Sequence, residues 1–127
     1  MKKLLLFSVA VLAFAFNTNQ TYECKTLGIS FKKNNQTYNI PNNKKTVEEL
    51  KKTLNNLYTV KIKPQKQNLE VYIGKNNDTL VFVKNLTKNV SVYKTVDSQL
   101  FIMLDNNSSQ IGINIPSQNM IIYYQCR

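Results

Sequence analysis

Residues 100–126 read LFIMLDNNSSQIGINIPSQNMIIYYQC. Three apolar runs, at residues 100–104, 111–115 and 120–126, are separated by two short polar clusters. Large apolar side chains recur along the runs at every second position, which is typical of strands with one buried face. The clusters contain the Asn, Asp, Ser and Pro residues that form tight turns. This stretch therefore predicts three consecutive antiparallel strands.

The same pattern continues through most of the upstream chain. Further runs rich in Val, Ile, Tyr and Phe predict strands at residues 59–63, 69–73, 79–84 and 90–95, and a first hairpin is expected from residues 22–32 and 36–40. Polar, turn-forming clusters such as residues 74–78 separate them. The predicted fold class is mainly β: an antiparallel meander, which can close into a barrel.

One segment departs from the strand pattern. Residues 46–49, TVEE, fit a capping box, and Leu50, Leu54 and Leu57 then recur at helical spacing up to Tyr58. We predict a single amphipathic helix whose apolar stripe covers one face or opening of the sheet. A helix that binds a partner is the alternative.

The start of the chain indicates export. Two lysines precede an apolar run at residues 4–16, in which Ala13 and Ala15 have the spacing that signal peptidase prefers. This run is shorter than the ~20 apolar residues that span a bilayer. We expect residues 1–15 to be a signal peptide and residues 16–127 to form one exported domain in the periplasm or outside the cell. An uncleaved anchor is the alternative.

Export changes how the two cysteines, Cys24 and Cys126, are interpreted. Cysteines in an oxidising compartment usually pair, and a bond between these two would close a loop of roughly 100 residues, worth about 4 to 5 kcal/mol in the chain-entropy model. The alternative, a reactive thiol, has no histidine anywhere in the chain to activate it. We predict a disulfide that joins the first and last strands.

The charge balance predicts the kind of partner. The net charge is +10, and all of the basic residues except Arg127 are lysines. Lysine is a hydrated point charge suited to loose attraction toward anionic lipid, polysaccharide or an acidic protein, whereas arginine suits bidentate phosphate recognition. Nucleic-acid binding is disfavoured by the predicted export. The candidate binding residues, which cluster around one predicted hairpin, are Lys61, Lys63, Lys66, Tyr72 and Lys75.

Catalysis finds little support in the residue inventory. The absence of histidine excludes Ser-His-Asp and Cys-His arrangements, and the seven acidic residues are scattered. Two carboxylates that converge in space would still allow a small glycoside hydrolase. The chain has no zinc or calcium ligand spacing and no Gly-rich phosphate cradle. We expect a non-enzymatic protein with no metal and no cofactor.

A short motif marks a candidate modification site. Asn107 begins an Asn-x-Ser sequon, and the acidic Asp105 two residues earlier resembles the extended sequon of bacterial N-glycosylation systems. An ordinary polar turn is the alternative, because an asparagine-rich chain produces sequons by chance. Plain sequons also occur at Asn19, Asn35, Asn77, Asn85, Asn89 and Asn106.

The chain's ends carry one resemblance. Tyr22-Glu23-Cys24 at the first strand, with Cys126 closing the last, is similar to the small periplasmic C-type lysozyme-inhibitor family. That resemblance implies a compact antiparallel barrel that blocks an enzyme's active site. The chain lacks the family's Ser-Gly-x-x-Tyr inhibitory loop, so no inhibitory residue is carried over.

These observations together predict a small exported binding protein of the bacterial periplasm or cell envelope. We expect it to bind an anionic or glycan-like envelope ligand, or an acidic protein, at a sheet face or barrel mouth. The alternative is a periplasmic inhibitor that acts on an enzyme through a projecting turn.

Overall fold

The computed structural model describes residues 16–127, so the predicted signal peptide at residues 1–15 lies outside the described part of the chain. In that part, no helix is long and apolar enough to cross a membrane. The helical segments are α2 (Val47–Leu54), η1 (Asn55–Leu57) and η2 (Pro116–Gln118). The strands are β1 (Tyr22–Lys33), β2 (Gln36–Pro41), β3 (Thr59–Pro64), β4 (Asn68–Ile73), β5 (Asn76–Asn85), β6 (Val90–Lys94), β7 (Phe101–Asp105), β8 (Gln110–Ile115) and β9 (Met120–Cys126).

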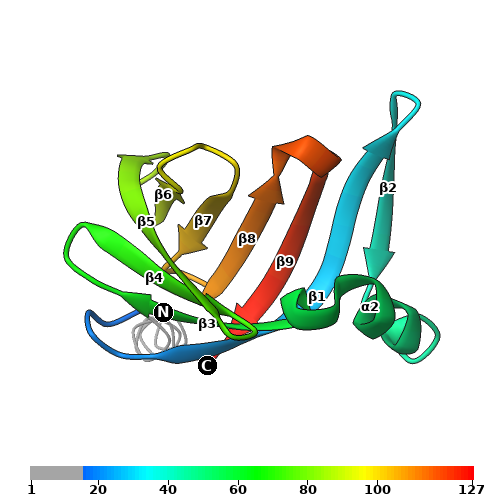
Figure 1. Cartoon of the computed structure of the whole chain (residues 1–127), viewed down its shortest axis with the longest axis horizontal. Coiled ribbons are helices and arrows are strands. Elements are labelled where there is room, and N and C mark those ends of the chain that lie inside the picture. The colour runs from blue at the N-terminus through cyan, green and yellow to red at the C-terminus, as the bar shows by residue number, and fades with distance from the viewer. Residues whose placement is uncertain (1–15) are drawn as a thin grey trace, which may run out of the picture.

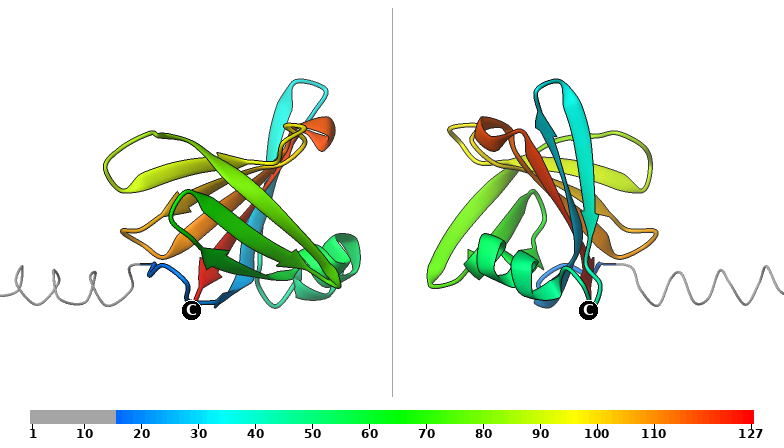
Figure 2. Two further views of the ribbon diagram at one scale, coloured as in Figure 1. Left: turned by 60° about the vertical axis from the view of Figure 1, so that its left-hand side comes forward. Right: turned by 90° about the vertical axis from the view of Figure 1, so that its right-hand side faces the viewer.

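Eight of the strands close into an antiparallel barrel (Figure 1). From β3 to β9 each strand pairs with the next one in the sequence, and β1 completes the ring by pairing with β3 on one edge and β9 on the other. β2 pairs only with β1 and forms a hairpin that projects beyond the barrel (Figures 1 and 2). The predicted mainly β meander is confirmed, and it is a closed barrel.

The predicted strands are confirmed, and most of their bounds differ from the observed ones by one residue or none. β5 differs most, because residues 76–78 belong to it and not to the predicted turn at 74–78. These polar residues pair with the end of β4, since ladder hydrogen bonds use main-chain groups. The observed turn therefore consists of Gly74 and Lys75, with Gly74 at a φ of 60°, a conformation that glycine adopts without strain.

β1 changes its pairing partner halfway along its length. Its first part pairs with β3, its second part pairs with β2, and a bulge lies between Thr26 and Gly28. At this point the Thr26 hydroxyl donates to the Tyr58 carbonyl at 2.6 Å. The Asn42 side-chain amide donates to the Thr26 carbonyl at 2.8 Å and to the Tyr58 hydroxyl at 2.7 Å. These bonds hold β2 and the start of β3 against β1.

Glycine is required beside this bulge. A Cβ atom on Gly28 would lie 2.8 Å from the carbonyl oxygen of Ile40, so a larger residue would push the β1–β2 pair apart.

The predicted helix is present but differs in detail. It begins at Val47 as expected and ends at Leu54, with the last turn tightened into η1, whereas the prediction extended to Tyr58. The predicted capping box was wrong, because the Thr46 hydroxyl donates to the Pro41 carbonyl and makes no cap bond to the helix. Leu50 and Leu54 are buried, which confirms that the apolar stripe faces the core.

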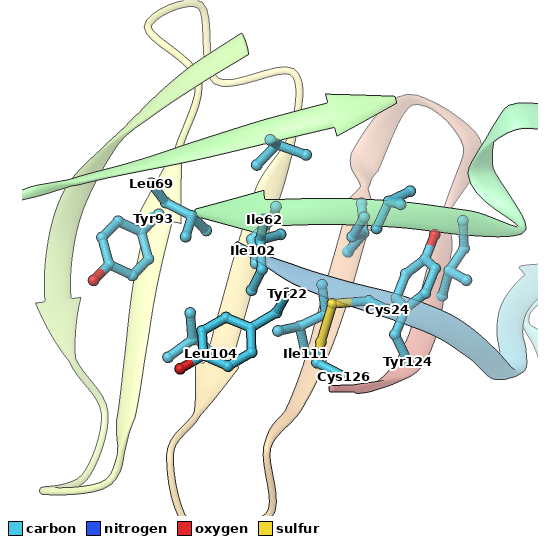
Figure 3. Close-up of a cluster of buried hydrophobic side chains, with 14 of the residues drawn as sticks. Tyr22, Cys24, Ile62, Leu69, Tyr93, Ile102, Leu104, Ile111, Tyr124 and Cys126 are labelled. Carbon is cyan, nitrogen blue, oxygen red and sulfur yellow. A yellow bond between two sulfur atoms is a disulfide. The ribbon is translucent and has the colours of Figure 1, made fainter. Parts of the chain in front are cut away.

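Inward-facing aliphatic side chains from successive strands fill the barrel (Figure 3). The fully buried ones include Ile62, Leu69, Leu80, Ile102, Ile113 and Ile122. Burial of each such side chain stabilises the fold by about 1.5–3 kcal/mol. Tyr124 is also fully buried, and its hydroxyl donates to the Leu57 carbonyl at 2.6 Å, which ties β9 to the segment that follows the helix.

The predicted disulfide is confirmed. Cys24 of β1 and Cys126 of β9 are cross-strand partners, both are buried, and their bond spans 102 residues of sequence (Figure 3). Such a bond is consistent with an oxidising, non-cytoplasmic compartment.

Removal of the disulfide should destabilise the barrel strongly. We expect Cys24→Ala/Cys126→Ala to lower the free energy of unfolding by about 4 to 5 kcal/mol, because the unfolded chain loses a constraint on a loop of this length. Urea denaturation of both proteins, with and without reductant, measures the difference. Reductant should have no effect on the variant, and a loss below about 1 kcal/mol would contradict the entropic account.

Tyr124 should make stability fall at alkaline pH. Burial raises the pKa of its phenol from 10.0, so above pH 10 the unfolded chain loses a proton that the folded protein keeps. The stabilisation that this neutral, buried phenol gives the fold is complete below pH 10 and declines as the pH rises further. Tyr124→Phe should flatten the decline of the free energy of unfolding between pH 10 and 11.5 by up to about 1.4 kcal/mol per pH unit. Urea denaturation at several pH values measures the free energy of unfolding of the wild type and of Tyr124→Phe. The same pH dependence in both proteins would refute the role given to Tyr124.

Candidate ligand-binding pocket

The two ends of the barrel differ in construction. The disulfide end carries residues 16–21, the last residue, Arg127, and the β3–β4, β5–β6 and β7–β8 turns. There Phe16 packs edge-on against Tyr22, with their ring centres 4.9 Å apart, and covers the core. The helix end carries the β1–β2 hairpin, α2, the β4–β5 turn, the β6–β7 loop and η2 (Figure 1).

A pocket of about 560 Å³ opens at the helix end, between α2 and the inner face of β1 and β2. We call it the helix-end pocket. Ile29 and Leu50 are its buried members, and Phe31, Ile40 and Met120 are apolar members that remain partly exposed. Its polar members are Lys45, Thr46, Glu49, Thr53 and Gln118.

The partner change of β1 explains why this apolar surface is open. Ile29 and Phe31 continue the inward-facing positions of β1, and Phe31 is the cross-strand partner of Met120. The pairing of β1 with β3 has already ended at Lys25, so no strand of the β3 side lies beside this part of β1. α2 is the element that covers it, and a helix of eight residues leaves part of the apolar surface uncovered.

Several contacts fix the helical segment beside the pocket. The Lys51 ammonium lies 5.7 Å from the centre of the Tyr58 ring, a cation–π arrangement. Asn56 lies against Gly74 in the β4–β5 turn. With the buried Leu50 and Leu54, these contacts keep the wall formed by α2 in place.

A second, more polar pocket of about 490 Å³ lies beside the β6–β7 loop and contains Asp78 and Asp97. The Thr95 hydroxyl and the Gln99 main-chain N–H donate to Asp97 at 2.8 and 3.2 Å, and these bonds lower the pKa of its carboxyl. A glycosidase acid needs a raised pKa, so Asp97 is better suited to ordering its loop. Among residues 16–127, no group of three His, Cys, Asp or Glu residues is placed to hold a metal ion.

The structure brings three of the five predicted binding residues together and leaves the other two apart. Lys61 and Tyr72 are cross-strand partners, and Lys63 is paired with Glu70 on the same two strands. Lys66 lies in the β3–β4 turn and Lys75 in the β4–β5 turn, at opposite ends of β4. Lys61, Lys63 and Tyr72 therefore share the outer face of β3 and β4, whereas Lys66 and Lys75 do not lie beside each other.

Acidic side chains accompany this lysine face. Glu23 of β1 is the cross-strand partner of Lys61, and the Tyr72 hydroxyl donates to the Glu70 carboxylate at 3.1 Å. The positive potential over β3 and β4 is therefore partly neutralised.

The sequence prediction did not include the residues of the helix-end pocket. Phe31, Ile40 and Met120 belong to strands that were predicted, and their apolar character made them resemble ordinary core residues. The one indication was the amphipathic helix, which was expected to cover an opening.

Comparisons with protein-family models, with curated proteins and with solved structures gave no match.

Proposed function

We propose that the protein is a non-enzymatic binding protein of the bacterial periplasm or cell envelope, and that its ligand is an anionic amphiphile such as a fatty acid or an anionic lipid. The observation that carries this proposal is the helix-end pocket, in which apolar side chains stay partly exposed beside a polar rim. Ligand pockets commonly combine such a lining with a few polar groups, at volumes of about 300–1,000 Å³.

The lining favours an apolar chain as the buried part of the ligand. Ile29, Phe31, Ile40, Leu50 and Met120 offer no side-chain hydrogen-bonding group except the weak thioether acceptor of Met120. Each methylene transferred from water to such a surface gains about 0.8 kcal/mol. Affinity should therefore rise with chain length until the pocket is full. A glycan would find too few polar partners in this pocket.

The charge distribution favours a negative head group. The described part carries a net charge of +8, because only Lys2 and Lys3 of the charged residues lie outside it. Lys45 lies on the pocket rim, and its neighbour Lys44 is exposed. Glu49 lies on the same rim and would repel an anionic head group. A carboxylate or phosphate head is therefore expected beside Lys45. Lys61 and Lys63 would attract the protein to an anionic surface.

Binding of the anionic fluorophore 1-anilinonaphthalene-8-sulfonate, and its displacement by fatty acids, tests the pocket. We expect displacement to strengthen with chain length, and a fatty acid to compete better than the matched alcohol. Ile40→Asp should weaken binding at least tenfold, equivalent to about 1.4 kcal/mol, because it places a charge in the apolar lining. Lys45→Glu should weaken binding of the acid more than that of the alcohol.

The matched control is Leu86→Asp, which introduces the same charge at an exposed position in the β5–β6 turn of the disulfide end. It should bind the probe as the wild type does, with thermal unfolding confirming that both variants fold. Equal loss of affinity in Ile40→Asp and Leu86→Asp, or affinity independent of chain length, would count against the pocket.

Sedimentation with vesicles that contain an anionic phospholipid tests the lysine face. Lys61→Glu/Lys63→Glu should reduce retention at low salt and leave the affinity for the free probe unchanged, because retention depends on charge and the pocket is untouched. Lys84→Glu/Lys88→Glu changes the net charge equally, at exposed positions near the disulfide end. Equal effects of the two variants would show that net charge, and not this face, controls retention.

One observation favours inhibition of an enzyme as a second candidate. The β1–β2 hairpin projects beyond the barrel (Figure 2). It carries Tyr38, which is exposed and stacked on Phe31 with ring centres 5.3 Å apart. Such a hairpin has the shape to enter a cleft. An inhibitor would remain bound to one enzyme at high salt, whereas the retention proposed above would be lost.

A further inference from the structure

Ser109 is poorly suited to its place in the folded protein. Seven non-glycine residues between 16 and 127 have positive φ, and five of these are asparagines, which tolerate this conformation. The other two are Ser98 and Ser109. The Ser98 hydroxyl accepts a hydrogen bond from the Lys94 ammonium at 2.9 Å. Ser109 has a φ of 56°, is 3 % exposed, and its hydroxyl has no hydrogen-bond partner in the described chain. The buried hydroxyl of Ser108 also lacks a partner, but Ser108 does not have a positive φ.

Folding alone would favour glycine at this position. Glycine adopts positive φ without a steric penalty and has no hydroxyl to bury. A buried hydroxyl without a partner destabilises a fold, and such groups call for a separate explanation. The serine side chain at position 109 is therefore explained by a state of the chain other than the folded one.

The neighbouring residues indicate what that state is. Ser109 is the third residue of the sequon that begins at Asn107, whose side chain is exposed in the β7–β8 turn. The acidic residue two positions before the asparagine is Asp105, and its carboxylate accepts the Asn107 main-chain N–H at 2.9 Å. None of the other six sequons in the chain has an acidic residue at that position.

We propose that Asn107 is N-glycosylated during export, and that Ser109 supplies the hydroxyl that an oligosaccharyltransferase recognises. The co-substrate is an oligosaccharide linked to a polyprenyl pyrophosphate. The Asn107 amide nitrogen forms a bond to C1 of the first sugar as the bond from C1 to the phosphate oxygen breaks. The polyprenyl pyrophosphate leaves with the electron pair of that bond, and the amide proton passes to a base of the transferase. This proposal requires export and is independent of the ligand proposed above.

The structure also indicates when the reaction takes place. In the folded turn, the Ser109 carbonyl accepts the Cys126 N–H at 2.9 Å, and the Gln125 side chain donates to the Ser108 carbonyl at 3.0 Å. The end of β9 therefore holds the turn closed over the buried hydroxyl. β9 follows the turn in the chain, so the sequon is exported before its cover exists. Modification then precedes docking of β9 and formation of the disulfide at Cys126.

Coexpression with a bacterial oligosaccharyltransferase, followed by intact-mass and glycopeptide mass spectrometry of the exported protein, tests the site. The wild type and Ser109→Thr should carry a glycan at Asn107. Asn107→Gln and Ser109→Gly should not, and Asp105→Asn should have at least tenfold lower occupancy. Ser109→Gly should also unfold at a higher temperature than the unglycosylated wild type. An unmodified wild type, a glycosylated Ser109→Gly, or a Ser109→Gly with lower thermal stability would overturn the proposal.

Purified components test the order of events. The transferase and its lipid-linked donor should modify the reduced, unfolded wild type at least tenfold faster than the oxidised, folded protein. Equal rates on the two forms would overturn the inference that modification precedes closure of the turn.

Discussion

The pairing of β1 with β9 is the constraint on which the rest of the structure depends. Without it the sheet would have two open edges, and with it β1 and the strands from β3 to β9 form a closed ring. The pairing brings together residues that lie 102 positions apart, so the chain loses conformational entropy when it closes this loop on folding. The Cys24–Cys126 bond offsets that cost. Main-chain hydrogen bonds between Glu23 and Arg127, at 2.8 and 2.9 Å, extend the seam beyond the disulfide.

The same strand creates the opening at the other end. β1 has twelve residues, and β3 pairs only with its first part, so the second part takes β2 as its partner. The bulge at Thr26 and Gly28 marks the change, and the hydrogen bonds of Asn42 and Thr26 to Tyr58 stabilise it. Beyond that point, α2 is what covers the inner side of β1. The helix-end pocket therefore follows from how β1 divides its pairing.

Much of the fold could be predicted because alternation and turn residues report local structure. The hairpin around Asn34 and Asn35, the strand bounds and the buried face of α2 all follow from such local patterns. The disulfide followed from combining the predicted export with two cysteines. Alternation does not encode which strands pair, so the partner change of β1 required the structure, whereas the predicted bond between the first and last strands already indicated closure into a barrel. Thr46 shows a further limit, because its hydroxyl prefers the Pro41 carbonyl to the helix end.

The helix-end pocket was harder to predict because it depends on which apolar side chains remain uncovered in the folded protein. Phe31 and Met120 have the spacing of core residues. They stay partly exposed because β3 does not extend along this part of β1, so that only α2 covers its inner side. The predicted binding residues came together only in part: Lys61, Lys63 and Tyr72 share one face, and Lys66 and Lys75 do not join them. Neighbouring turns of a meander lie at opposite ends of the strand between them, and a six-residue strand such as β4 separates Lys66 from Lys75 by about 20 Å. For these two lysines, closeness in sequence therefore did not become closeness in space.

Two local conflicts with the ordinary rules of packing and hydrogen bonding lie at opposite ends of the barrel. At the helix end, apolar side chains stay partly exposed, and at the disulfide end the buried hydroxyls of Ser108 and Ser109 lack hydrogen-bond partners. In natural proteins, local conflicts with packing or hydrogen bonding concentrate at sites shaped by function. Neither conflict stabilises the folded chain, so each is best explained by something outside it. Because the two places are separated by the length of the barrel, a glycan on Asn107 would leave the pocket open to its ligand.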